Sequence, residues 1–500
     1  MGDMLSNLSL GFSVALSLQN VVLCFIGCLI GTLIGVLPGV GPIATIAMLL
    51  PLTFKVDPTG ALIMLAGIYY GAQYGGSTTA ILVNIPGEAT SVITVLDGHQ
   101  MARQGRAGVA LGTAAIVSFF AGCVATVIIA ALGLPLTRLA LLFGPTEYFS
   151  LMAMGLAFAI VLARGSLLKA VAMIFLGILL STVGTDIETG EPRLTLGFSD
   201  LEGGIDFAVL AMGLFGFTEI VRNLETPETR DVIKRRIGKL LPGREDFRQL
   251  WKPMVRGTLI GAGLGILPGN GAVLGPFASY SVEKKVAKDP SRFGRGAIEG
   301  VAGPEAANNA GAQTAFIPLL TLGIPPNAVM ALMVGAMTIH GVIPGPLIMS
   351  KSPDLFWGMV ASMWIGNLML LIINLPLIGA WVRLLKVPYR LMYPSILIFC
   401  CIGIYSINNS PSDVVLTALF GFVGYALFKF GFEVAPLVLG FVLGRLMEEK
   451  LRQSMIISRG DVMAFIHSPV SAVLLLLGAA IVVLAVLPTI RKGREEAFQE

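Results

Sequence analysis

The sequence predicts an all-α polytopic membrane protein with about 12 hydrophobic spans, arranged as inverted-topology repeats that contain broken or hairpin helices. Hydrophobic residues make up 55% of the chain and charged residues only 13%, whereas soluble proteins carry about 25% charged residues. Apolar runs close to the ~20 residues that cross a bilayer recur along the whole chain. An apolar segment interrupted by proline and glycine occurs twice, and this duplication is what predicts the repeats.

Regular membrane helices are expected where apolar runs are free of clustered glycine and proline. These runs cover residues 108–133, 146–163, 167–182, 207–221, 356–378, 391–407, 414–430, 432–446 and 468–489. Two further regions, 15–98 and 257–349, are apolar but rich in Gly, Pro, Asn, Ser and Thr. Regular helix is not expected to run through these two regions unbroken.

The charges of the connections predict how the chain is oriented. Residues 222–256 carry ten basic and five acidic side chains, and a short loop this basic belongs in the cytoplasm. The basic loop 283–295 and the basic cluster 491–494 are expected on the same side. By contrast, residues 183–206 carry six acids and one arginine, which suits the outer side. The first 54 residues contain no Lys or Arg, so we expect the N-terminus outside and no cleaved signal peptide.

Two apolar segments of the chain are broken in the same way. The stretch "GVLPGVG" ends at Gly41, and the similar stretch "GILPGNG" ends at Gly271. The same offset places Gly31 on Gly261. A second pair of motifs, "YGGSTTAILVNIPG" (74–87) and "NAGAQTAFIPLLTLGIPP" (309–326), can be matched with a four-residue insertion. The chain therefore contains two copies of one pattern.

The basic connection divides the chain into an N-terminal transmembrane repeat half (1–221), a basic cytoplasmic linker (222–256) and a C-terminal transmembrane repeat half (257–500). The hairpin at 20–52 should start and finish outside, and the hairpin at 257–282 inside. Two halves of opposite orientation, with breaks at matching places, are the signature of inverted-repeat secondary transporters.

The breaks themselves have a physical use. A helix that stops inside the membrane exposes backbone groups that cost several kcal/mol each in lipid, so a ligand, water or another segment must satisfy them. Amide ends suit anions and carbonyl ends suit cations, which predicts a site for an anionic solute and a coupling cation, with Na⁺ possible at the same breaks. Close helix packing is the alternative role of such small and polar residues. The residues expected to form the site are Gly39, Gly41, Ser77, Thr78, Thr79, Asn84, Gly269, Asn270, Gly271, Glu305, Asn308, Asn309, Gln313 and Thr314.

Acidic residues inside apolar segments are functional candidates because they are costly to bury. Glu305, in "GPEAANNAG", is the best candidate for coupling to a cation or for orienting the asparagines, and Glu88 directly follows a break. Glu219 and Glu433 are interpreted as solvated residues close to loops.

An enzyme is a less favoured class for this chain. "GNGAVLG" (269–275) lacks the strand and the Lys-Ser/Thr of a nucleotide loop, and no H-E-x-x-H occurs. The five cysteines form no paired metal spacing, and no cofactor is expected. A membrane-embedded enzyme stays open only if a Ser/Lys or Asp pair converges in the fold.

Several long motifs, in order, resemble the large membrane subunit of the tripartite tricarboxylate transporters, the TctA family. They are "GVLPGVGP" (35–42), "YGAQYGGSTTAILVNIPG" (70–87), "DGHQMARQGRAG" (97–108), "EGVAGPEAANNAGAQTAFIPLLTLGIP" (299–325) and "LGFVLGRLMEEKLRQSMIISRGD" (439–461). The departures are modest: Pro326 stands where the N-terminal copy has Gly87, and Arg445 stands where the family is expected to have proline.

This resemblance implies a multi-pass permease of the bacterial inner membrane, driven by a Na⁺ or H⁺ gradient. It would work with a small four-helix membrane subunit and a periplasmic solute-binding protein that delivers carboxylates such as citrate, and not with nucleic acid. A stand-alone cation–carboxylate symporter without the binding protein is the alternative.

Overall fold

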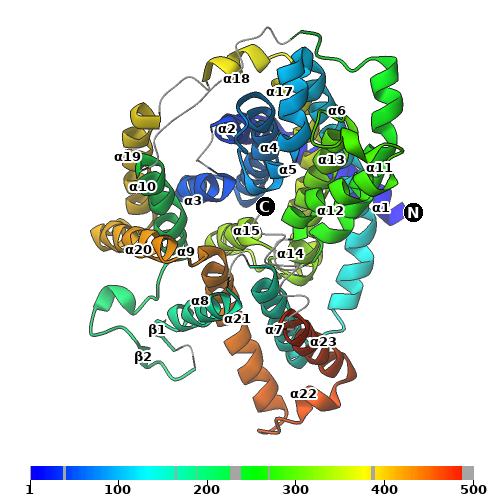
Figure 1. Ribbon diagram of the computed structural model, residues 1–500. Helices are drawn as coiled ribbons and strands as arrows, with labels where there is room; N and C mark the ends of the chain where they lie inside the picture. The colour runs from blue at the N-terminus through cyan, green and yellow to red at the C-terminus, as the bar shows by residue number, and fades with distance from the viewer. Residues whose placement is uncertain are drawn as a thin grey trace.

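The computed structural model describes residues 2–37, 41–163, 166–186, 188–225, 238–267, 271–384 and 389–486, and these confirm the predicted all-helical fold (Figure 1). Within them, the only strands are β1 (Gly184–Thr185) and β2 (Pro192–Arg193), which pair antiparallel.

The helices of the N-terminal half are α1 (Gly2–Ala15), α2 (Leu18–Val36), α3 (Pro42–Thr53), α4 (Pro58–Val83), η1 (Ala89–Ser91), α5 (Val92–Thr94), η2 (Val95–His99), η3 (Ala102–Arg106), α6 (Ala107–Ala140), α7 (Pro145–Leu162), α8 (Leu167–Ser181), η4 (Ser199–Leu201), α9 (Phe207–Ala211), η5 (Met212–Phe217) and α10 (Thr218–Glu225). The helices that follow are α11 (Arg244–Gly265), α12 (Gly271–Val286), η6 (Pro290–Arg292), α13 (Glu299–Thr314), α14 (Phe316–Leu322), α15 (Ala328–Ile339), α16 (Ile348–Lys351), α17 (Pro353–Asn374), α18 (Ile378–Leu384), α19 (Tyr389–Asn408), α20 (Pro411–Lys429), α21 (Val434–Ile457), α22 (Ala464–His467) and α23 (Pro469–Val486).

The predicted regular spans coincide with helical segments. Five helical segments are long and apolar enough to cross a membrane, and several shorter apolar helices accompany them. The chain is therefore a multi-pass membrane protein, while the number of about 12 spans stays a prediction.

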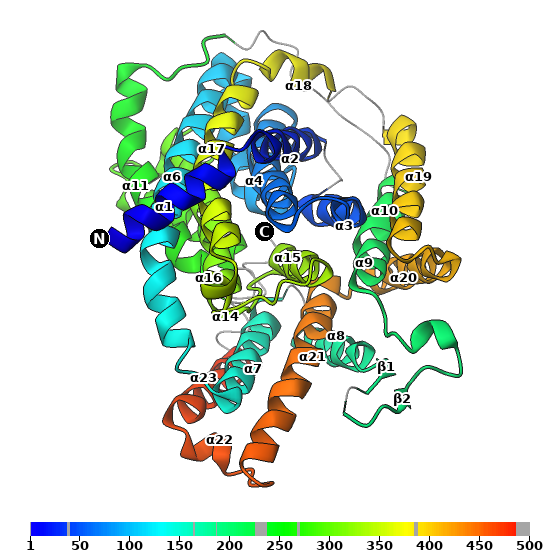
Figure 2. The same cartoon turned by 180° about the vertical axis from the view of Figure 1, so that it is seen from behind.

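The helices form three neighbouring groups. α2, α4, α6, α11, α12, α13 and α17 pack together, while α7, α8, α21 and α23 form a second group (Figures 1 and 2). The third group, α10, α19 and α20 with η5, packs against α3. Both broken regions of the sequence thus contribute to the first group.

The two glycine-proline breaks interrupt helices as predicted. α2 ends at Val36 and α3 starts at Pro42, and the equivalent gap separates α11 from α12. Residues 38–40 and 268–270, at the tips of the breaks, lie outside the described residues.

The motif "GGSTT", which the sequence places beside a break, lies inside a regular helix. α4 runs unbroken for 26 residues, and the interruption comes only after it, at Asn84. Every residue of α4 from Gly60 to Val83 is buried, so tertiary packing outweighs the poor helix propensity of its glycines, serine and threonines. The "ANNAG" motif likewise lies inside α13.

α2 and α4 pack backbone against backbone. A Cβ atom added at Gly31 would lie only 2.4 Å from the carbonyl oxygen of Ile68, so no larger residue fits without movement. The two helices run parallel, since the contacting residues advance together along both, and small residues every fourth position permit this close approach. The contacting pairs are Gly27–Met64, Gly31–Ile68 and Gly35–Ala72.

α11 and α13 repeat this packing in the second half. The contacting pairs are Gly257–Gly303, Gly261–Ala307 and Gly265–Gly311. The glycines on α11 follow those on α2 at the offset that separates the two breaks, as the sequence predicts. The residues that they contact on α13 are also separated from the equivalent residues on α4 by one constant number of positions, which is larger than the first offset. The internal sequence repeat is therefore a repeat of helix packing.

The four-residue insertion expected in the second motif is wrong. Asn84 and Gly323 both end a helix in the left-handed region, with φ of 61° and 73°. The sequence separation between Asn84 and Gly323 equals that between each glycine partner on α4 and its equivalent on α13. The motif therefore aligns without a gap. The extra residues of the second copy lie before it, in the longer connection between α12 and α13.

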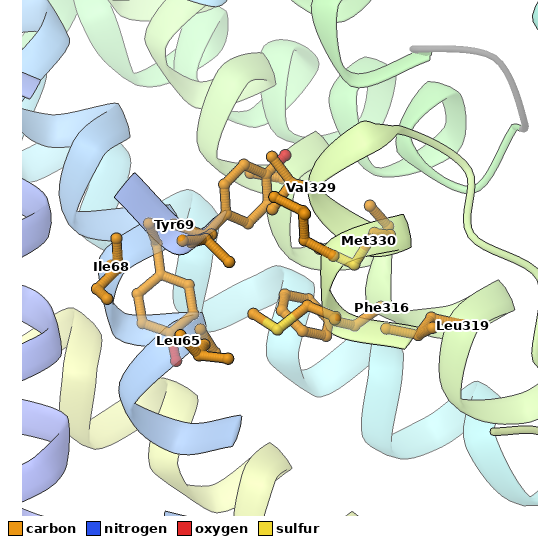
Figure 3. Close-up of a cluster of buried hydrophobic side chains, with 14 of the residues drawn as sticks. Leu65, Ile68, Tyr69, Phe316, Leu319, Val329 and Met330 are labelled. Carbon is orange, nitrogen blue, oxygen red and sulfur yellow. The ribbon is translucent and has the colours of Figure 1, made fainter. Parts of the chain in front are cut away.

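α4 and the α13–α14 pair run in opposite directions. Ser77 hydrogen bonds Glu305, whereas Tyr69, earlier on α4, packs against Phe316, later in the chain, with ring centroids 6.4 Å apart. Figure 3 shows Tyr69 and Phe316 within an apolar cluster that also includes Met330 of α15. An inverted repeat requires this antiparallel arrangement, and the orientation of each half in a membrane stays a prediction.

The basic connections expected in the cytoplasm lie close together. Arg106 forms an ion pair with Asp246 at 2.5 Å, and Gln104 donates to the carbonyl oxygen of Arg295 at 2.8 Å. The ends of the predicted linker 222–256 are helical, in α10 and α11. Its centre, 226–237, and the basic C-terminal residues lie outside the described residues.

Candidate functional site

Buried polar side chains from both halves meet at Glu305 of α13. The carboxylate of Glu305 is fully buried. One of its oxygens accepts a hydrogen bond from the Ser77 hydroxyl at 2.6 Å, and the other accepts from the Thr94 hydroxyl. Ser77 and Glu305, both among the residues expected to form the site, are therefore in direct contact.

The next turns of α13 face α6. The Asn309 side-chain amide donates to the Ser118 hydroxyl at 2.6 Å and to the Glu305 carbonyl oxygen at 3.1 Å. One turn later, the side-chain oxygen of Gln313 accepts from the Thr126 hydroxyl at 2.7 Å. Residues four apart lie on one face of a helix, so Glu305, Asn309 and Gln313 form a polar stripe.

Asn308 has the least satisfied side chain of the cluster. It is fully buried, and neither its amide nitrogen nor its amide oxygen has a hydrogen-bond partner among the described residues. The side-chain oxygen of Asn309 and the side-chain nitrogen of Gln313 are also buried without partners there. Because buried polar groups in proteins are as a rule hydrogen bonded, these groups can bind a ligand or water.

Three of the predicted hydroxyl residues contact backbone carbonyl oxygens, each of a different helix. The Thr79 hydroxyl lies 2.9 Å from the carbonyl oxygen of Val36, at the end of α2, and 3.2 Å from that of Gly35. Thr314 donates to the carbonyl oxygen of Ala262 and so ties α13 to α11. Thr78 contacts a carbonyl of its own helix at 3.4 Å, the bond that Ser and Thr commonly make within helices.

The two matching glycines at the breaks differ in their surroundings. A Cβ atom at Gly41 would meet no atom of the described residues within 4 Å, whereas one at Gly271 would lie 1.9 Å from the carbonyl oxygen of Leu264. Gly41 is therefore loosely surrounded by the described part of the chain, and Gly271 allows α12 to start against α11. Gly39, Gly269 and Asn270 lie outside the described residues.

Among the described residues, no hydrogen bond links Asn84 to this cluster. It is exposed and ends α4. Glu88 follows it in a second polar group, in which the Thr90 hydroxyl lies 2.8 Å from both Glu88 and the side-chain oxygen of Gln73. Ser77 contacts the backbone of Gln73 at 3.1 Å, so this group adjoins Glu305 through α4.

Other acids of the apolar segments lie on other helices: Glu219 in α10 and Glu147 in α7, while Glu433 directly precedes α21. Glu219 is half-buried and lies 3.6 Å from Arg222 in α10. Glu147 accepts from the backbone amide of Gly144 at the start of α7 and from the Ser468 hydroxyl at 2.5 Å. Glu147 therefore holds the start of α7 beside α23.

A small cavity adjoins the cluster between α4, α6 and α17. Its volume is about 10 Å³, which is close to the room that one water molecule needs. The buried hydroxyl of Tyr74 borders it without a partner among the described residues. The cavity is lined by Tyr74, Ser77, Thr78, Leu111, Ala114, Ala115, Ser118, Asn374 and Ile378.

Three residues that hydrogen bond directly to the predicted ones were not expected from the sequence. They are Thr94, Ser118 and Thr126. Ser118 and Thr126 are eight residues apart in an apolar span, a spacing that puts both on one helix face, and this is a usable signal. Thr94 carries no comparable signal because it lies in the short helix α5, between the two motifs on which the interpretation rests.

The fold and the site define a class: a multi-pass helical membrane protein in which two similarly packed, broken units meet at a buried polar cluster. The family model described as "Tripartite tricarboxylate transporter TctA family" matches residues 21–439. The chain belongs to this family, which is a family of transporters.

Two proteins of Agrobacterium vitis are similar to the chain. One, described as an uncharacterized 52.8 kDa protein in the TAR-I ttuC' 3' region, is 58% identical over 500 residues, which cover both chains completely. The other, described as an uncharacterized protein in the TAR-II ttuC' 3' region, is 60% identical over 240 residues, 48% of this chain and 99% of that protein. No solved structure matches the chain.

Proposed function

We propose that this protein is the large membrane subunit of a binding-protein-dependent tripartite transporter, and that it takes up small carboxylates together with Na⁺ or H⁺. The observation that carries the proposal is a fully buried carboxylate, Glu305, hydrogen bonded to hydroxyls of the other half of the chain and near Asn308, whose amide has no partner among the described residues. A buried ionisable group between two membrane-embedded units is a common feature of ion-coupled transport.

The side chains of the cluster suit two different ligands, a carboxylate substrate and a coupling cation. The amides of Asn308, Asn309 and Gln313 and the hydroxyl of Ser77 can donate to a carboxylate substrate. Glu305 supplies the negative charge that a coupling cation needs, either as a ligand for Na⁺ or by accepting a proton. A substrate carboxylate would be repelled by an unneutralised Glu305, which gives a physical reason for coupled binding.

The cavity supports a transport cycle with a closed intermediate. Its volume of about 10 Å³ holds no carboxylate substrate, so α4, α6 and α13 would move apart to admit one from either side. Antiparallel repeat units that meet at the site are suited to such alternating access.

Membership of the family supports a proposal about the partners and the location. We infer that the protein lies in the bacterial inner membrane, pairs with a small four-helix membrane subunit, and receives citrate or a related organic anion from a periplasmic solute-binding protein. The second candidate, a stand-alone cation–carboxylate symporter, is favoured by the site itself, because all residues of the cluster come from this one chain.

Uptake of labelled di- and tricarboxylates into proteoliposomes tests the proposal. The liposomes would hold both membrane subunits, with an imposed Na⁺ or proton gradient and with or without the binding protein. Uptake that requires the gradient and the binding protein is expected. Uptake that needs the gradient alone would favour the stand-alone symporter, and no carboxylate uptake in any combination would refute the transport proposal.

Asn308→Ala and Asn309→Ala are each expected to weaken the apparent affinity for substrate about three- to tenfold. Each variant removes one or two ligand hydrogen bonds, worth roughly 0.5–1.5 kcal/mol with a neutral partner and more with a charged one. The concentration dependence of uptake measures the effect. Asn308 has no partner among the described residues, so its variant should keep wild-type thermal stability, whereas Asn309→Ala also leaves Ser118 without a donor. Unchanged affinity in both variants would assign these residues to packing.

Gly41→Val is expected to block uptake without lowering expression. The backbone at Gly41, with φ of −78° and ψ of 169°, is extended and suits valine, and the added side chain meets no atom of the described chain within 4 Å of its Cβ. The side chain would instead fill the approach to the break. Measurement of membrane-inserted protein beside uptake separates the two effects, and normal uptake by a well-inserted Gly41→Val protein would remove this position from the site.

A further inference from the structure

The connection between α8 and α9 presents large apolar side chains on the surface. Leu194 is 51% exposed, Leu196 is 84% exposed and Phe198 is 64% exposed. Thr195, between the two leucines, is buried. The segment therefore turns its apolar residues outward and a polar one inward, the reverse of what a loop in water does.

Ion pairs hold this connection against α21. Arg193 contacts Glu448 at 2.6 Å and Asp186 at 3.3 Å, and Arg452 contacts Asp186 at 2.8 Å. The hydrogen bond from Arg452 lowers the pKa of Asp186 to about 2, so its carboxylate stays charged at any physiological pH. A permanently charged cluster thus fixes the start of the apolar segment.

A second contact fixes the position of the segment relative to α20. Asp200, just after Phe198, accepts a hydrogen bond from the hydroxyl of Ser412, the second residue of α20. Val415 of α20 is 70% exposed, three residues or about 4.5 Å further along the helix, and it begins an exposed apolar face that continues at Phe422. Both views show the connection at the edge of the molecule beside α20 (Figures 1 and 2). The segment therefore lies beside the end of α20 at which the exposed apolar face of that helix begins.

The backbone of the segment is unusual for its residue types. Leu194 and Leu196 both have φ of 53°, in the left-handed region that favours glycine and asparagine. This conformation carries a steric cost for leucine, and an exposed turn in water gains nothing from it. Contact with an apolar phase would compensate that cost.

We propose that Leu194, Leu196 and Phe198 insert into the interfacial layer of the bilayer and anchor the α8–α9 connection to phospholipid. Apolar side chains bury at the boundary between headgroups and acyl chains, while the charged cluster beside them stays at the polar surface. The anchor would hold α8, α20 and α21 at a constant depth. It depends on the chain being a membrane protein and not on the substrate that is carried.

Nitroxide labelling of the full-length protein in nanodiscs of phosphatidylethanolamine and phosphatidylglycerol tests the anchor. A cysteine replaces Leu196 in a background whose five native cysteines are alanine, and the accessibility of the label to oxygen and to a water-soluble nickel chelate is measured. Glu191→Cys, in the same connection and exposed, is the control for water, and Phe422→Cys is the control for lipid. Unchanged thermal unfolding of each labelled protein establishes that it is folded.

The label at position 196 is expected to show an oxygen-to-nickel ratio close to that at position 422 and well above that at position 191. A ratio equal to that at position 191 would overturn the proposal. A label that is open to the nickel chelate in lipid alone, and becomes protected only when a purified solute-binding protein is added, would also overturn it and would identify a protein-docking surface.

Discussion

Glu305→Gln is expected to abolish gradient-driven uptake while the protein stays folded. Glutamine has the size of glutamate and can still accept a hydrogen bond from Ser77, so the packing of α4 against α13 is preserved. It cannot carry the charge that a coupling cation requires. Hydrogen bonds to a charged group are worth roughly 1.5–3 kcal/mol, so binding of the coupling cation alone should weaken about tenfold or more.

The control for this variant is Glu147→Gln. Glu147 also accepts a hydroxyl hydrogen bond, from Ser468, but it lies at the start of α7 and not in the Glu305 cluster. Uptake of a labelled carboxylate under a Na⁺ or proton gradient, normalised to inserted protein, should be near the wild-type value for Glu147→Gln. Gradient-dependent uptake by Glu305→Gln at the wild-type rate would exclude Glu305 from coupling.

Gly261→Ala is expected to destabilise the protein, whereas Gly263→Ala on the same helix should not. A Cβ atom at position 261 would lie 2.1 Å from the carbonyl oxygen of Ala307, and backbone cannot move aside as a side chain can. Overpacking of this kind costs about 1–3 kcal/mol or more. A Cβ atom at Gly263 meets no atom of the described chain within 4 Å, and alanine there should raise the free energy of unfolding by up to about 0.5–1 kcal/mol because it favours the helix.

Thermal unfolding in detergent measures both glycine variants. A lower midpoint for Gly261→Ala together with an equal or higher midpoint for Gly263→Ala is the expected result. Equal midpoints for the two would mean that α11 and α13 are not in backbone contact in the folded protein.

The helical architecture was predictable because apolar run length is a direct physical requirement of the bilayer. The repeat was predictable as well, since Gly261 and its equivalents must be small for the backbones to touch. The exact alignment of the second motif was not, because it depends on the left-handed helix ends at Asn84 and Gly323, and an asparagine and a glycine do not look alike in sequence. Local propensity also misplaced "GGSTT", which is helical because α2 packs on it.

The candidate site was predictable in its centre and not at its edges. Glu305 and Ser77 stood out because a charged residue and a hydroxyl cluster are conspicuous in apolar segments, and they do bond to each other. Ser118 lies within a span that looked purely structural, since a single serine in a membrane helix is ordinarily a packing residue. Whether the cluster binds substrate and cation stays a prediction.

The backbone contacts of the two glycine stripes have a mechanical consequence. α2 with α4, and α11 with α13, are in backbone contact at their glycines, where a carbonyl oxygen faces the glycine directly, so neither pair can slide internally without a clash. Each pair should therefore move as a rigid body. The contact between the two pairs includes hydrogen bonds, among them the one from Ser77 to Glu305, and we expect a proton, a cation or a substrate anion to disrupt it. A ligand that disrupts these hydrogen bonds would therefore change the contact between the two helix pairs directly, without deforming either pair.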